Sequence, residues 1–219
     1  MLTLINKITS HLVVAPPCAG TEKDASHKTN NGNDGPDRGF AHCGVATDDA
    51  PALAAALAAA GVRLFTSDAE PFQCGRQFAQ DPDGYWVELM SSPSAPAGTG
   101  TRCSLATTAL RVRDPARSLA FYQGLCGMSL VAHQRHAAHA TFELAQLPPG
   151  TALPDPAADP AAGRQLAVAR RATRLELIHA FGTESLEKSP YHSGNDDENG
   201  KIRGWGHSCV AHLIRPPSS

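Results

Sequence analysis

Several signatures of large functional classes are missing from this chain. Its 219 residues contain no apolar run approaching the roughly 18 residues of a membrane-spanning helix. Neither sign of charge predominates, because 19 Lys and Arg stand against 21 Asp and Glu. A nearly neutral balance argues against a non-specific nucleic-acid binder or a polybasic membrane binder. No P-loop or GxGxxG motif occurs. We therefore expect neither a membrane nor a nucleic acid as partner.

Paired cysteines are missing as well. The six cysteines stand singly, at positions 18, 43, 74, 103, 126 and 209, and form no CxxC pair. This spacing implies neither a zinc knuckle nor a disulfide scaffold. The first 20 residues lack the basic segment followed by an apolar segment that marks a signal peptide. We expect reduced thiols and a cytoplasmic protein.

What the chain does contain is an internal repeat. Three blocks recur in the same order: Gly20-Thr21-Glu22 as Gly182-Thr183-Glu184, Gly32-Asn33-Asp34 as Gly194-Asn195-Asp196, and Arg38-Gly39-Phe40-Ala41-His42 as Arg203-Gly204-Trp205-Gly206-His207. The first two blocks recur after 162 residues and the third after 165. We interpret the chain as a little more than one repeat unit, which starts late in one copy and ends early in the next.

Strand and helix patterns alternate in the same order twice. Residues 38–90 predict strand 41–47, helix 51–60 and strands within 61–65, 75–80 and 84–90. Residues 104–180 predict strand 104–112, a helix opened by Asp114-Pro115, and strands 128–134, 139–145 and 173–180. A Pro- and Ala-rich stretch, 147–163, is expected to be a surface insertion. The fold class is therefore α+β, built of paired βαβββ modules whose mixed sheets curl around a metal cleft.

Three side chains on these strands could bind a metal ion. His42 lies on the first strand of one module, Glu88 on its last strand, and Glu176 on the last strand of the other module. Each Glu is flanked by apolar residues, so its side chain points to the opposite face from theirs. An isolated Glu of this kind usually lies at an exposed edge, but two at matching places favour a site. One His and two Glu offer nitrogen and oxygen ligands to zinc or another divalent ion.

A family resemblance rests on several motifs. They are Leu110–Pro115 with Ser118–Tyr122, Gly127–Leu130, Leu175-Glu176-Leu177 followed by Gly182-Thr183-Glu184, Tyr191-His192 with Gly194-Asn195, Arg203–His207, and Asp81-Pro82-Asp83-Gly84-Tyr85-Trp86-Val87-Glu88. The motif ending at Glu88 is the most specific. With these motifs the sequence resembles glyoxalase I (lactoylglutathione lyase), of the vicinal-oxygen-chelate superfamily, over most of its length.

The resemblance implies a division of the chain. Residues 38–92 correspond to a second-type module and 104–182 to a first-type module, joined by a linker at 93–103. Residues 1–37 correspond to the partial end of a first-type module, and 183–219 to a loop and the truncated start of a further module. In two-repeat members of the family, the second module of one repeat can pair with the first module of the next to form one metal site.

The resemblance also implies a site. His42, Glu88 and Glu176 correspond to metal ligands, with zinc expected and nickel or another divalent metal as the alternative. Glu88 corresponds to the catalytic base. Arg38 and Arg111 correspond to positions that bind glutathione carboxylates. Thr107 stands where the family has a Gln or His ligand, and His207 lacks a partner Glu in this chain.

The implied reaction is isomerisation of the hemithioacetal of glutathione and methylglyoxal to S-lactoylglutathione, by a monomer or a homodimer. A catalytically impaired remnant, or a non-catalytic binding protein of the same fold, is the main alternative. Metal content distinguishes them, since a remnant would hold no stoichiometric zinc. A different enzyme of the superfamily, such as a dioxygenase or epimerase, is a third possibility, which the blocks around Gly194-Asn195 and Arg203 disfavour.

Overall fold

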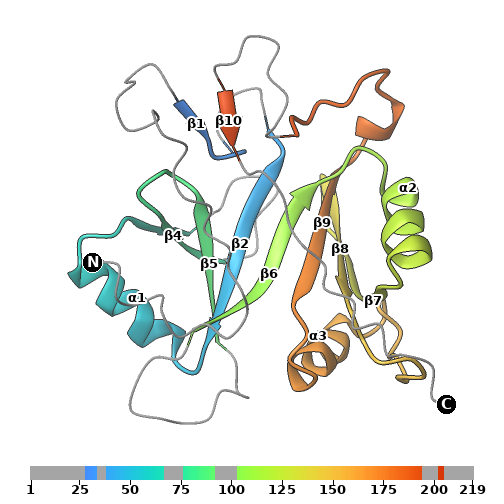
Figure 1. Cartoon of the computed structure of the whole chain (residues 1–219), viewed down its shortest axis with the longest axis horizontal. Helices are drawn as coiled ribbons and strands as arrows, with labels where there is room; N and C mark the ends of the chain where they lie inside the picture. Colours follow the sequence, from blue (N-terminus) through green and yellow to red (C-terminus); the bar gives the residue numbers. More distant parts are fainter. Residues whose placement is uncertain (1–27, 34–37, 67–75, 92–102, 194–201, 205–219) are drawn as a thin grey trace, which may run out of the picture.

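A computed structural model describes residues 28–33, 38–66, 76–91, 103–193 and 202–204 of the chain (Figure 1). The side chains of 28–30 and 202–204 are not described. The expectations for residues 1–27, for His207 and for most of the predicted linker lie outside the described residues.

Eight strands form one mixed sheet in the order β3-β4-β5-β2-β6-β9-β8-β7. Their bounds are β2 Phe40–Thr47, β3 Leu64–Thr66, β4 Gln77–Gln80, β5 Trp86–Ser91, β6 Ser104–Arg111, β7 Ser129–Arg135, β8 His139–Ala145 and β9 Arg174–Ala180. The first half runs β-α-β-β-β along the chain, and the second half has the same order with one more helix before its last strand. In each half the first strand pairs in parallel with the last, β2 with β5 and β6 with β9. Antiparallel pairing of β2 with β6 joins the halves. The predicted α+β class is confirmed, with the two sets of strands fused into a single sheet.

The helices α1 and α2 cover one face of this sheet. α1 (Ala50–Ala59) packs Leu53 and Ala54 against Ala79 and Leu89. In the other half, α2 (Pro115–Leu119) continues into a π-helical turn, η2 (Ala120–Leu125), and both contribute side chains to a core around buried residues of β8 and β9. Because strand side chains alternate, the residues between these core positions point to the opposite face, which carries the site described below.

The stretch expected to be a surface insertion contains a third helix, α3 (Pro160–Ala169), so that expectation was incomplete. Asp159 caps the helix by accepting a hydrogen bond from the backbone N–H of Ala162 at 2.9 Å, and Pro160 follows at its first turn. The same Asp-Pro signal opens α2 at Asp114, so the sequence did carry the start of α3. The high content of Pro and Ala in residues 147–163 obscured this signal for a helix start. α3 packs against β7.

The contact between α3 and β7 depends on Gly163. A Cβ atom there would lie 1.6 Å from the carbonyl oxygen of Val131. We therefore expect Gly163→Ala to lower the free energy of unfolding by about 1–3 kcal/mol, because the helix must move off the strand. Urea denaturation would measure this. Gly124→Ala is the matched control, since its Cβ would meet nothing within 4 Å. Equal stabilities for the two variants would contradict the close packing of α3.

Segments from the two sequence copies exchange contacts outside the main sheet. β1 (Lys28–Asn30) pairs in parallel with β10 (Ile202–Gly204), which belongs to the other copy. Reciprocally, the backbone N–H of His192 donates to the carbonyl oxygen of Arg38 at 2.7 Å. His192 lies 162 residues after Asn30, and Arg203 lies 165 residues after Arg38. Each of these two contacts thus joins a segment from the first part of the chain to a segment near its end.

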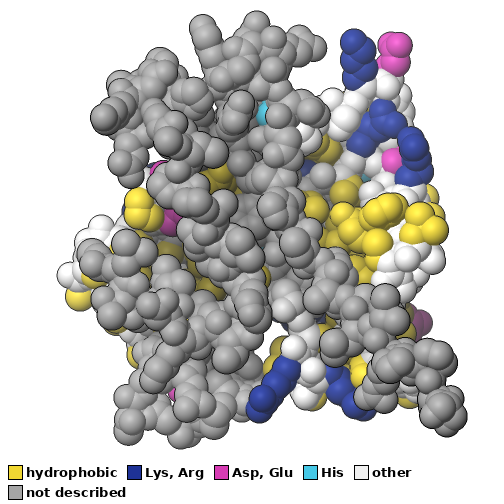
Figure 2. All heavy atoms as spheres, viewed as in Figure 1, with side chains coloured by type: hydrophobic (Ala, Val, Ile, Leu, Met, Phe, Trp, Pro, Cys, Tyr) yellow, Lys and Arg dark blue, Asp and Glu magenta, His cyan; other side chains and the backbone are white. Residues whose placement is uncertain are grey.

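The surface over α2 and η2 shows hydrophobic side chains at the right of the space-filling view (Figure 2). On η2, Phe121 is 50% and Leu125 is 80% exposed. The helices of the described part of the chain are all too short or too polar to span a membrane.

Candidate metal centre

Three strands bring the three predicted ligands to one place. His42 lies on β2, Glu88 on β5 and Glu176 on β9. Ala109 of β6 is paired with both His42 and Glu176, so these two ligands stand in one row across the sheet with a fully buried Ala between them. The small Ala side chain leaves room for the two larger ones to approach each other above it.

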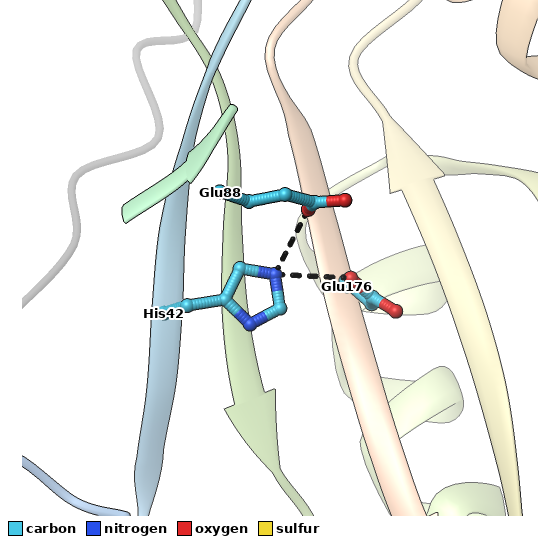
Figure 3. A group of neighbouring side chains, drawn as sticks. All are labelled: His42, Glu88 and Glu176. Carbon is cyan, nitrogen blue, oxygen red and sulfur yellow. Dashed lines mark ion pairs between the residues drawn. The ribbon is translucent and has the colours of Figure 1, made fainter. Parts of the chain in front are cut away.

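The ligand atoms converge on a small volume (Figure 3). Nε2 of His42 lies 3.2 Å from Oε2 of Glu88 and 3.5 Å from Oε2 of Glu176. One ligand atom from each residue lies within 4.8 Å of the others. All three residues are buried. The structure therefore brings together the three residues that the sequence singled out.

The positively charged side chain of Arg76 lies beside the carboxylates of Glu88 and Glu176. The guanidinium of Arg76 donates two hydrogen bonds to Glu176, Nη1 to Oε2 at 2.9 Å and Nη2 to Oε1 at 3.0 Å. Its Nε lies 3.6 Å from Oε1 of Glu88. Burial alone would raise the pKa of Glu176, but the charges of Arg76 and His42 outweigh it and hold that pKa well below its usual value. The site is thus built around two negative charges that require a positive partner.

The carboxylates of Glu88 and Glu176 also change the pKa of the His42 imidazole. Burial disfavours the charged form of His42, yet hydrogen bonds and charge from Glu176 and Glu88 outweigh burial and raise its pKa. A buried anionic pair with one imidazole is a donor set that suits a divalent ion with nitrogen and oxygen ligands. Three protein ligands would leave open positions for water or substrate, as in catalytic rather than structural zinc sites. The residues present therefore fit a divalent metal.

Comparison with known proteins agrees with this geometry. Residues 8–89 match the family model described as the Glyoxalase/Bleomycin resistance protein/Dioxygenase superfamily. Two curated relatives are similar over 88% of this chain: "Glyoxalase I" of Saccharomyces cerevisiae, 34% identical over 197 residues, and "Lactoylglutathione lyase" of Schizosaccharomyces pombe, 34% identical over 193 residues. The chain is thus similar to members of the Glyoxalase/Bleomycin resistance protein/Dioxygenase superfamily.

The chain covers 55% of the budding-yeast relative and 58% of the fission-yeast relative, so it spans about half the length of the curated relatives it matches. A crystal structure of glyoxalase I from Zea mays aligns with 66% of this chain and 43% of the maize chain, at 29% identity and a TM-score of 0.46.

The other predicted site residues are placed differently from the three ligands. Thr107 lines the cavity beside Glu88 and Glu176, and its buried hydroxyl has no hydrogen-bond partner among the described residues. Arg111 donates hydrogen bonds to the carbonyl oxygens of Gly32 and Phe40, at 2.8 and 2.9 Å, and to Oδ1 of Asn33 at 2.7 Å.

The guanidinium of Arg111 therefore anchors the backbone near the start of β2. Burial, with the nearby charge of Arg38, lowers its pKa to about 10. Arg38 is exposed. Neither arginine is among the residues that line the cavity, and their role in binding glutathione stays a prediction.

The cavity at the site has a volume of about 280 Å³ and includes residues that the sequence analysis missed. Its lining consists of Arg76, Glu88, Met90, Thr107, Gln134, Glu143, Arg164, Arg174 and Glu176. A signal for Glu143 was present, because it lies between Phe142 and Leu144 on β8 with the same alternation as Glu88 and Glu176. Arg174 likewise shares the site face with Glu176, two residues away on β9. Arg164 was hidden because α3 was not predicted.

The position of Arg76 predicts competition between this residue and a metal ion. Charge-assisted hydrogen bonds of this kind are worth about 1.5–3 kcal/mol each, and a metal at Glu176 must displace them. We expect Arg76→Gln to raise the affinity for zinc by about tenfold or more. Isothermal titration calorimetry of the metal-free chain would measure this change. Arg117→Gln, which alters an exposed arginine on α2, should leave the affinity unchanged. A weaker affinity in Arg76→Gln would show that Arg76 supports the metal site.

Proposed function

We propose that this chain, with a divalent metal bound, isomerises the hemithioacetal of glutathione and methylglyoxal to S-lactoylglutathione. The observation that carries the proposal is the convergence of ligand atoms of His42, Glu88 and Glu176, with both carboxylates lining one cavity, in a chain similar to proteins named glyoxalase I and lactoylglutathione lyase. Zinc is the metal we favour, with nickel or another divalent ion as the alternative.

The reaction moves a proton between two adjacent carbons and gains or loses no atoms. The metal would supply Lewis-acid stabilisation of the negative charge that develops on the two vicinal oxygens of the substrate. His42, Glu88 and Glu176 would hold it through one imidazole nitrogen and carboxylate oxygens. Open positions would then remain on the cavity side.

Glu88 is the residue that we assign as the base. Its carboxylate would take the proton from the carbon next to sulfur and return it to the neighbouring carbon. Glu88 lines the cavity, where the substrate must lie, and its side chain is 9% exposed. Glu176 approaches the same volume from β9, with a side chain 3% exposed. Because Glu88 lies at the position that corresponds to the base in the family resemblance, we assign Glu176 as a ligand and Glu88 as the residue that moves the proton.

The test is turnover by the purified full chain after loading with zinc. Formation of the thioester, followed by its ultraviolet absorbance, should depend on the metal and disappear after chelation. A chain that binds zinc stoichiometrically but forms no thioester would support a non-catalytic binding protein of the same fold. A chain that binds no zinc would support the remnant.

Thr107 provides a second test of the ligand geometry. We expect Thr107→Gln to raise both zinc affinity and turnover, because an amide oxygen on a longer side chain can add a ligand that the short hydroxyl cannot. Changes outside the direct ligands typically alter metal affinity or activity 10–100-fold, so a gained ligand should reach at least about tenfold.

Zinc titration and thioester assay of Thr107→Gln would be compared with Thr107→Val. Valine keeps the shape of Thr107 and removes a hydroxyl without a described hydrogen-bond partner, so it should leave both quantities nearly unchanged. If Thr107→Gln also leaves both unchanged, the side chain at position 107 does not reach the metal.

A further inference from the structure

We propose that Arg174, supported by Arg164, binds a carboxylate of the substrate beside the reacting carbons. This inference rests on the proposed function, because it concerns the substrate of the same site. The inference goes beyond the proposed function by assigning an anion-binding subsite to residues that neither the metal nor the base requires.

The first observation is the position of Arg174. It lies two residues before Glu176 on β9, on the same face of the sheet, so the two Cα atoms are about 6–7 Å apart. Both side chains line the cavity. A group bound by Arg174 must therefore belong to a part of the substrate that lies close to the metal ligands.

The second observation is how few strong acceptors Arg174 has within the part of the chain that the structure describes. Its side chain is only 10% exposed. Its Nε lies 3.4 Å from Oε2 of Glu143, and its Nη2 donates to Sδ of Met90 at 3.5 Å. The first contact is long, and a thioether is a weak acceptor. A nearly buried guanidinium with five donors is thus only partly satisfied by these two contacts, which favours an added anion.

The third observation is that Glu143 is shared. Its Oε1 accepts from Nε of Arg164, while Nη2 of Arg164 donates to Oε1 of Gln134. Burial, with the charge of Glu176, raises the pKa of Glu143 although Arg174 and Arg164 act in the opposite direction. Even with Glu143 ionised, two guanidinium groups share one carboxylate. Within the cluster of Glu143, Arg164 and Arg174, guanidinium groups therefore outnumber carboxylates. The other two carboxylates of the cavity, Glu88 and Glu176, are in contact with Arg76 and His42.

The lining of the cavity points to the same chemistry. Among the described residues that line the cavity, Met90 is the only one with an apolar side chain. A hydrocarbon group in this space would displace water from charged side chains without replacing its hydrogen bonds, whereas a carboxylate would replace them. The carboxylate could come from an anionic substituent on an α-oxoaldehyde or from glutathione itself.

Two pairs of substrates distinguish these sources. In the first pair, glutathione forms hemithioacetals with an α-oxoaldehyde bearing a propionate group and with its propionamide analogue. In the second pair, methylglyoxal reacts with glutathione and with glutathione amidated at its glycine carboxylate. kcat/KM is measured for all four with the zinc-loaded full chain. We expect the wild type to prefer the charged member of one pair by about tenfold or more, because a binding site left with an unpaired charged group rejects the analogue.

Substitution of Arg174 then tests the assignment. Arg174→Met should bring that preference close to one, Arg174→Lys should retain part of it, and Arg170→Met, an exposed arginine at the end of α3, should leave it unchanged. Loss of preference in the first pair identifies the aldehyde as the source of the carboxylate, and loss in the second identifies glutathione. A preference that survives in Arg174→Met, or its absence from both pairs in the wild type, would overturn the proposal.

Binding without reaction separates this proposal from the proposed function. The probes are the unreactive thioether S-(carboxypropyl)glutathione and the thioether in which its carboxypropyl group is an amide, with S-methylglutathione and its glycine amide as the second pair. Calorimetry on the zinc-loaded wild type and on Arg174→Met would measure their affinities. If no hemithioacetal is turned over but Arg174→Met removes a preference for a carboxylate probe, the subsite stands and the isomerase assignment fails. If turnover occurs and no pair shows a preference dependent on Arg174, the isomerase assignment stands and the proposed subsite fails.

Discussion

Glu88→Gln is expected to lower kcat for hemithioacetal isomerisation by a factor of about 10²–10⁴, the range that a positioned general base contributes. The amide keeps an oxygen that can face the metal, but it cannot accept the proton. The side chain is nearly isosteric, so the fold around His42 should persist. The measurement is thioester formation at saturating substrate, with the zinc content of each sample determined in parallel.

The matched control is Glu187→Gln, which removes the same charge from an exposed position shortly after the 3₁₀-helical turn η3 (Thr183–Ser185). It should leave kcat unchanged. Full turnover by Glu88→Gln with stoichiometric zinc would show that Glu88 is not the base. Reduced turnover that recovers at high zinc would show that the residue acts as a ligand alone.

Glu176→Gln is expected to have the largest effect on stability. Glu176 is ionised, buried and bonded through both oxygens to Arg76. Removing one partner of a buried pair leaves an uncompensated charge and costs about 3–5 kcal/mol. We therefore expect the free energy of unfolding of the metal-free chain at neutral pH to fall by about that amount, and zinc affinity to fall with it. Urea denaturation and calorimetry would measure the two effects.

Glu184→Gln is the control for this variant. Oε2 of Glu184 also lies close to a basic side chain, 2.9 Å from Nε2 of the His179 imidazole, but the Glu184 side chain is 49% exposed. Solvent screens such pairs, so the loss of stability should be much smaller. Equal losses in the two variants would show that Arg76 does not hold Glu176 in solution.

Much of the architecture followed from local pattern. The alternation in residues 139–145 predicted β8 with its observed bounds. Asp49 and Asp114 marked the starts of α1 and α2 through their capping positions. The same alternation placed Glu88 and Glu176 on the opposite face from their apolar neighbours, and the family motifs paired them with His42. Each of these signals is local, because the residues that carry it lie within a few positions of one another in the sequence.

The parts that could not be predicted depend on contacts between distant segments. Arg76 meets Glu176 across a sequence separation of 100 residues, and no local pattern encodes that approach. Glu143 and Arg174 carried the alternation signal, but their pairing follows from the register of β8 on β9. Arg164 joined them only because α3 lies against β7. The charged character of the cavity is therefore a property of the tertiary structure.

X-ray absorption spectroscopy of the zinc-loaded full chain tests the central claim most directly, because it identifies the atoms around the metal. With His42, Glu88 and Glu176 as ligands, the spectrum should show one imidazole nitrogen and otherwise oxygen, at about 2.0–2.2 Å. The imidazole signal should be lost in His42→Phe. A sulfur shell at about 2.3 Å, or a spectrum unchanged in His42→Phe, would show that zinc binds elsewhere and would contradict the account.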